Sequence, residues 1–235
     1  TYLYIAADME EPHVWATLKA RDSVIFRDND FEVFIDPDGD TQAYYEFEIN
    51  AFGTEWDLLL IKAYRDGGPA INAWDIAGLK TAVQVWGTIN QPEDLDQGWS
   101  VEMAFPWQVL KEAARRPAPP HDGDQWRINF SRVEWEVETD DGYYTKVEGK
   151  REDNWVWSPQ GLINMHVPER WGLVQFATAP VGTETVDFRP DPAEEARQLL
   201  RQIYYLQRQF KGEHKRYSSD LDSLGLEHRM LRHYL

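Results

Sequence analysis

One stretch, residues 28–51 (DNDFEVFIDPDGDTQAYYEFEINA), constrains the possible folds most strongly. Apolar Phe31, Val33 and Ile35 occupy alternate positions before an acidic turn that contains Gly and Pro, and the same alternation resumes after the turn. A period of two predicts a β-hairpin with one buried face. We therefore expect these apolar residues to anchor the core, and Glu32 and Glu46 to face the ligand side.

Strand-like alternation recurs along the chain from Tyr2 to Phe176, with turn residues between the segments. About nine strands are expected. One short amphipathic helix is predicted from Pro106 to Arg115, because proline suits the first turn of a helix. The pattern predicts an all-β fold, an antiparallel β-sandwich of jelly-roll or immunoglobulin-like type, over residues 1–178.

The period changes after Ala177. Apolar residues then recur every three or four positions between Asp191 and Gly212, which predicts a helix. Residues 179–235 are thus expected to form a linker and a C-terminal helical extension. This basic tail carries a net charge of +4 from Arg197 onward, against −21 for residues 1–196. We expect intramolecular docking of the helix against the acidic sandwich, or contact with a partner.

Charge and composition exclude several classes of protein. The net charge of −17 repels nucleic acid and anionic membranes, and no apolar run approaches the ~20 residues of a membrane span. The chain has no cysteine, so disulfides and thiolate metal sites are excluded. Its 11 tryptophans and 11 tyrosines supply flat apolar faces suited to stacking on sugars, although most aromatic residues are expected in the core.

The acidic turn itself could hold a cation. Asp36, Asp38 and Asp40 place oxygen ligands at alternate positions, as in the first half of a calcium loop. Because no glutamate completes a twelve-residue loop, Glu46 or Asp8 would supply the bidentate ligand. The alternative is a solvated turn, for which Asp-Gly and Pro-Asp are ordinary chemistry.

Catalytic and haem-binding functions have less support. Paired carboxylates can hydrolyse glycosides, but the sequence identifies no acid and base. No nucleophile-elbow, Walker or Rossmann motif occurs. Haem ligation by Met165 and His166 together is disfavoured, because adjacent side chains on a strand point to opposite faces. The chain is therefore expected to be a binding module, with no catalytic residues assigned.

Several ordered blocks carry a resemblance: YLYIAAD, DFEVFIDPDGD, GWSVEMAFPW, GDQWRINFSRVEW, NWVWSP and ERWGLVQF. Together they resemble the family-9 carbohydrate-binding modules and the family-9-like domains of bacterial secreted proteins, over Thr1 to Phe176. The resemblance implies a calcium-containing β-sandwich that holds the end of a sugar chain between two aromatic side chains. By position these fall near Phe26 and Met165. Members usually have a further N-terminal segment, so the chain is expected to lack one strand and to be truncated.

Methionine offers no aromatic platform, so other residues are expected to take part. The predicted ligand-binding residues are Phe26, Trp74, Trp155, Trp157, Met165, His166, Glu32, Glu46, Asn129, Arg132 and Gln160. The predicted function is non-catalytic binding of oligo- or polysaccharide by a secreted or periplasmic glycan-utilisation protein, with calcium as cofactor. The alternatives are a glycan-active enzyme or its accessory domain, a structural or interaction sandwich with a decayed sugar site, and a haem-binding relative.

Overall fold

The computed structural model describes residues 1–226, so the last nine residues of the predicted C-terminal segment, 227–235, lie outside the described part. Strands alternate with turns through the first unit, Thr1–Val186, and a second unit begins at Asp187. The strands are β1 (Tyr2–Glu10), β2 (Asp30–Asp36), β3 (Gln42–Asn50), β4 (Glu55–Lys62), β5 (Ala70–Ile71), β6 (Lys80–Trp86), β7 (Gly98–Pro106), β8 (Gln125–Glu134), β9 (Val137–Asp140), β10 (Tyr143–Lys146), β11 (Asp153–Val156) and β12 (Gly172–Gln175). The helices are α1 (Trp107–Leu110) and α2 (Glu194–His214), with short 3-10 turns η1 (Ile25–Arg27), η2 (Tyr64–Asp66), η3 (Pro168–Arg170) and η4 (Asp222–Leu224).

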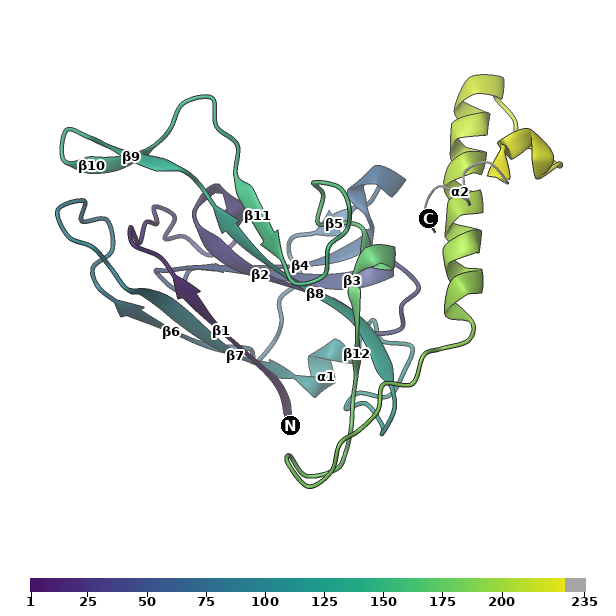
Figure 1. Cartoon of the computed structure of the whole chain (residues 1–235), viewed down its shortest axis with the longest axis horizontal. Coiled ribbons are helices and arrows are strands. Elements are labelled where there is room, and N and C mark those ends of the chain that lie inside the picture. Colours follow the sequence, from purple (N-terminus) through teal and green to yellow (C-terminus); the bar gives the residue numbers. More distant parts are fainter. Residues whose placement is uncertain (227–235) are drawn as a thin grey trace. The chain divides into compact units, whose positions relative to one another are not determined.

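Two antiparallel sheets form the first unit (Figure 1). The larger sheet has the order β11-β8-β2-β3-β4-β5, and β12 also pairs with β8. The smaller has the order β1-β7-β6, while β9 and β10 form a separate hairpin. The predicted all-β sandwich with a C-terminal helix is thus confirmed, and the hairpin of residues 28–51 supplies β2 and β3 at the centre of the larger sheet.

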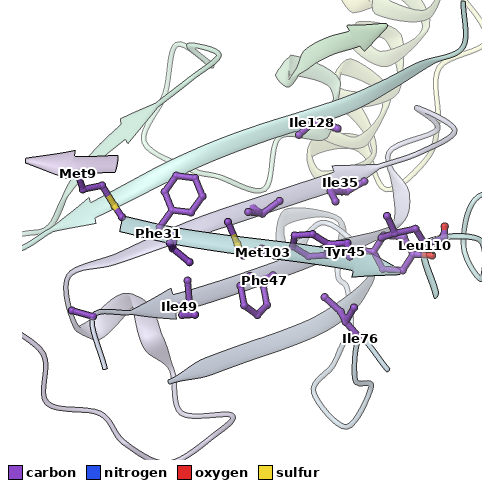
Figure 2. Packing of buried hydrophobic residues seen from close by; sticks show 14 of the residues in the cluster. Met9, Phe31, Ile35, Tyr45, Phe47, Ile49, Ile76, Met103, Leu110 and Ile128 are labelled. Carbon is purple, nitrogen blue, oxygen red and sulfur yellow. Dashed lines mark hydrogen bonds between the residues drawn. The ribbon is translucent and has the colours of Figure 1, made fainter. Parts of the chain in front are cut away.

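The core lies between the two sheets. Phe31, Val33 and Ile35 point into it from β2, as predicted, and Trp99 and Met103 reach it from β7 in the facing sheet. Figure 2 shows Phe31 and Ile35 of β2 and Met103 of β7 among the side chains of this core. Loss of one large aromatic residue from such a core typically costs about 3–5 kcal/mol of folding free energy.

The short helix α1 ends earlier than the sequence predicts. The hydroxyl of Tyr45 donates to the Leu110 carbonyl at 3.0 Å and accepts from the Ala113 N–H at 2.7 Å. A side chain from β3 therefore satisfies backbone groups at the end of the helix that another turn would otherwise have paired. Amphipathic spacing through Arg115 could not reveal this long-range contact.

A second apolar cluster lies on the outer face of the larger sheet. It contains Phe34, Tyr44, Leu58, Leu60 and Trp171, all fully buried. The indole N–H of Trp171 donates to the Met165 carbonyl at 2.8 Å. This cluster therefore fixes the segment before β12 against the outer face, beside the strands that carry the acidic residues.

The C-terminal helix α2 has an acidic first turn and a basic last turn, which complement the helix dipole. It passes through Gly212 and ends at His214, where Lys215 adopts a left-handed conformation with φ of 59°. Intramolecular docking of this helix on the sandwich stays a prediction. No helix within residues 1–226 has both the length and the apolar character to span a bilayer.

Candidate functional site

Strand alternation gathers acidic residues on the outer face of the larger sheet. Asp30 and Glu32 project from β2, and Glu46 and Glu48 from β3, opposite in direction to the core residues between them. Glu32 lies directly across from Glu48 in the register of the two strands. Like charges in such a pair are destabilising, so the arrangement needs a reason beyond folding.

A cavity of about 270 Å³ opens above these carboxylates. Side chains from β4, β8 and β11 and from four segments between the strands complete its walls. The lining residues are Phe26, Glu32, Glu46, Glu48, Trp56, Tyr64, Val133, Arg151, Glu152, Asn154, Ile163, Asn164, Met165 and His166.

Glu32, Glu46 and Glu48 form the acidic floor of the cavity, and their carboxylates are almost inaccessible to solvent. Glu32 is 4% exposed, and burial raises its pKa to about 7. Burial also raises the pKa values of Glu46 and Glu48 well above the ordinary range, and nearby Glu32 adds to both shifts. Glu48 accepts a hydrogen bond from the Phe26 N–H at 2.8 Å, which joins the floor to the loop before β2. These groups can donate or accept hydrogen bonds near neutral pH, depending on their protonation.

His166 forms one side of the cavity as a neutral group. Its Nδ1 lies 2.8 Å from the Tyr44 hydroxyl, and its Nε2 lies 3.7 Å from Oε1 of Glu46. Burial, with a smaller contribution from the positive charge of Arg65, lowers the pKa of His166 to about 4. Near neutral pH the imidazole therefore does not neutralise the carboxylates beside it.

Five of the predicted ligand-binding residues line this cavity together: Phe26, Glu32, Glu46, Met165 and His166. Met165 and His166 lie in a loop rather than on a strand, so adjacency does not send them to opposite sides. The expectation that they could not both ligate a haem iron assumed that they lie on a strand, and that assumption is wrong.

Three others line a separate hollow of about 350 Å³ beside the edge of β1. Trp155 and Trp157 are 64% and 53% exposed there, and Arg132 lies with them. Asn154 lines the cavity, while its neighbour Trp155 lines the hollow, because successive residues of β11 point to opposite faces. We call this second surface the tryptophan hollow. Arg132 forms an ion pair of 2.7 Å with Glu11.

The remaining three predicted residues have internal contacts. Trp74 stacks on Tyr45 with ring centroids 5.1 Å apart, and its indole N–H donates to Glu112 at 3.0 Å. Asn129 is fully buried and accepts the Ser158 N–H at 2.9 Å. Gln160 is buried, with its side-chain amide 3.3 Å from the sulfur of Met165. None of these three lines the cavity or the tryptophan hollow.

Several cavity residues were not among the predicted ones. Glu48 follows Glu46 by two positions, so the period of the strand could have placed both on one face. Trp56 lies across from Glu48 in the register of β3 and β4. Tyr64, Asn154 and Asn164 come from loops or edges whose approach only the tertiary fold determines.

The acidic turn has its own hydrogen-bonding arrangement. Asp36 accepts the Gly39 N–H at 3.0 Å and the Thr41 N–H at 2.9 Å through its two oxygens. Its carboxylate lies near those of Asp38 and Asp40, with one oxygen of each within 4.8 Å of the others. Glu46 lines the cavity instead. The other predicted calcium ligand, Asp8, is exposed on β1 in the smaller sheet, so the five predicted ligands do not form one site.

Comparison with known proteins supports the architecture. No family model and no curated protein matches the chain. A solved structure from Bacteroides uniformis, titled a "putative carbohydrate-binding protein", aligns with a TM-score of 0.51 and 20% sequence identity. The alignment covers 74% of this chain and 73% of that one. At this identity the similarity shows a shared fold, the β-sandwich described above.

Proposed function

We propose that the outer-face cavity binds a carbohydrate without cleaving it. The observation that carries the proposal is the composition of the cavity, in which buried carboxylates and half-buried amides share the lining with the aromatic residues Phe26, Trp56 and Tyr64. Carboxylates accept hydrogen bonds from sugar hydroxyls, while aromatic faces stack on the C–H faces of a pyranose ring. The volume lies at the small end for ligand pockets, which suits one sugar ring or a chain end.

Two further observations support this proposal. The sandwich is shared with the Bacteroides uniformis protein whose title refers to carbohydrate binding. The sequence blocks of the first unit resemble family-9 modules, which hold the end of a sugar chain. From the same resemblance we propose that the chain acts in a secreted or periplasmic glycan-utilisation protein.

Isothermal titration against xylo-, cello- and manno-oligosaccharides, with and without calcium, tests the function. Trp56→Ala and Tyr64→Ala should each weaken binding at least tenfold. Trp86→Ala on β6 is a matched control, since its 46% exposed indole lies outside the cavity. Absence of heat with every glycan would contradict carbohydrate binding, and loss of binding only in Trp155→Ala would move the site to the tryptophan hollow.

A glycan-active enzyme is the second candidate. Carboxylate oxygens of Glu32 and Glu48 lie within 4.8 Å, and burial raises the pKa of Glu32 to about 7, near the value of a general acid in glycoside hydrolysis. Incubation with end-labelled oligosaccharides distinguishes the two functions. A binding module leaves them uncut, whereas an enzyme shortens them and loses that activity in Glu32→Gln.

A further inference from the structure

The deepest part of the acidic floor has polar atoms without hydrogen bonds of ordinary geometry. Asp30 has 0% exposure, and neither of its carboxylate oxygens makes a hydrogen bond of ordinary geometry, although the nearby backbone N–H of Val133 favours its charged form. One oxygen of Glu32 and the hydroxyl of Ser131 are likewise buried without a hydrogen bond of ordinary geometry, although the hydroxyl lies close enough to favour the charged form of Glu32. Buried polar groups are nearly always paired, and a buried carboxylate without a partner is among the most costly exceptions.

These groups converge on one place. Ser131 on β8 lies directly across from Glu32, and Glu48 on β3 lies across from it on the other side. Asp30 is two residues before Glu32 on the same face of β2. One oxygen each of Asp30, Glu32 and Glu48 lies within 4.8 Å of the other two. Three adjacent strands thus direct three carboxylates and a hydroxyl toward a common centre.

No protein cation offsets this charge. Within residues 1–226, no lysine or arginine is ion-paired with any of the three carboxylates. Another acidic group of the chain, Asp22, Asp57 and Asp75, differs in this respect, because Arg21 forms ion pairs with all its members. The floor therefore lacks the internal counter-ion that the comparable cluster possesses.

We propose that Asp30, Glu32 and Glu48 hold a divalent cation at the floor of the cavity, and that Ca²⁺ is the ion that fits them. Carboxylate and hydroxyl oxygens are hard ligands of the kind that Ca²⁺ prefers. Ligands on opposite sides of a Ca²⁺ ion lie about 4.6–5.2 Å apart, so the ion spans the observed spacing without movement of the strands.

The position of the ion follows from the lining of the cavity. Glu32 and Glu48 belong both to the cluster and to the cavity wall, whereas Asp30 lies only in the cluster. Water or a ligand in the cavity would complete the coordination on that side. This cation site differs from the one predicted at the acidic turn, and its existence does not depend on the proposed carbohydrate function.

Calcium titration of the whole chain after chelator treatment tests the proposal. Calorimetry should show one Ca²⁺ bound per chain, with a rise in melting temperature. Terbium, a luminescent substitute for Ca²⁺, should be sensitised by Trp56, which lies across from Glu48 in the strand register. Asp30→Asn and Glu48→Gln should each lower the affinity at least about tenfold.

Matched variants separate loss of a ligand from loss of the fold. Glu102→Gln replaces an exposed glutamate on β7, and Asp38→Asn alters the acidic turn, so both should keep wild-type affinity. In chelator, Asp30→Asn should melt no lower than the wild type, because an amide of the same shape replaces a buried carboxyl group that has no ion-pair partner. The proposal is overturned if neither Ca²⁺ nor Mg²⁺ gives heat, if Asp30→Asn binds normally, or if only Asp38→Asn abolishes binding. Sugar titrations are a separate measurement, so either proposal can fail alone.

Discussion

The neutral state of His166 leads to a prediction about stability and pH. Its imidazole is packed among the rings of Phe34, Tyr44 and Tyr64, with centroids 4.5–6.1 Å away. Burial lowers the pKa from an ordinary 6.5 to about 4. The neutral imidazole is therefore favoured in the folded state, whereas the unfolded chain takes up a proton once the pH falls below about 6.5.

The sign and size of the effect follow from linkage. The stabilising contribution of His166 is complete above pH 6.5 and is lost as the pH falls toward 4, because the unfolded state then binds more protons. The difference of about 2.5 pKa units corresponds to about 3 kcal/mol in full. At pH 5 roughly 2 kcal/mol of it should already be lost.

Urea unfolding of the wild type and His166→Asn between pH 8 and pH 5, followed by tryptophan fluorescence, measures this contribution. The amide can keep a polar contact with Tyr44 but cannot titrate in this range. The stability of the wild type minus that of the variant should be constant above pH 6.5 and fall by about 2 kcal/mol at pH 5. The buried glutamates have raised pKa values, so their effect on stability changes with pH in the opposite direction to that of His166. Subtracting the stability of the variant from that of the wild type cancels this effect, since both proteins contain the same glutamates.

A matched control, His121→Asn, replaces an exposed histidine outside the cavity and reports effects unrelated to the site. An ion pair between protonated His166 and Glu46 would oppose this effect, because Oε1 of Glu46 lies 3.7 Å from Nε2 of His166. If the two ionise as a pair, the wild type will gain stability relative to His166→Asn as the pH falls. That result, or a stability difference between wild type and variant that does not change with pH, would refute the claim that the imidazole is neutral in the folded protein.

Three further predictions concern the scaffold. Asp28→Ala should cost about 2–4 kcal/mol of unfolding free energy in urea, because this buried carboxylate accepts four hydrogen bonds; an unchanged midpoint would show that water replaces them. Gly98→Ala should cost at least about 2 kcal/mol, since its φ is +141° and an added Cβ would lie 2.0 Å from the Met9 carbonyl oxygen; wild-type thermal stability would contradict this geometry. Gly212→Ala should stabilise α2 by about 0.5–1 kcal/mol in thermal melts followed by circular dichroism, whereas a lower midpoint would place Gly212 at a left-handed helix end.

Much of the sandwich could be predicted from period-two alternation. In β2 the core residues Phe31, Val33 and Ile35 alternate with Asp30, Glu32, Phe34 and Asp36, so the acidic residues point away from the core. The same pattern placed Glu32 and Glu46 on one face before any tertiary information. Alternation does not state which strands pair, so it could not show that Glu48 meets Glu32, or that Ser131 lies opposite on β8.

Aromatic residues were harder to assign because exposure depends on the whole fold. Trp155 and Trp157 are exposed as a sugar platform requires, yet they lie in the tryptophan hollow on the other side of the sheet from Glu32. Trp74, by contrast, stacks on Tyr45. Trp56 and Tyr64 line the cavity because β4 pairs with β3 and η2 follows β4, an arrangement that composition cannot reveal.

The acidic floor lies on strands that apolar packing holds on both faces. Glu46 and Tyr44 alternate along the outer face of β3, so costly carboxylates lie next to a fully buried aromatic residue of the second cluster. Below them, the core residues Tyr45 and Phe47 hold the same strand from its other face. Because apolar packing secures β3 on both faces, the strand can carry charges that weaken folding. The cost of burying these carboxylates is the shared observation behind the two proposals, the cation site and the carbohydrate site.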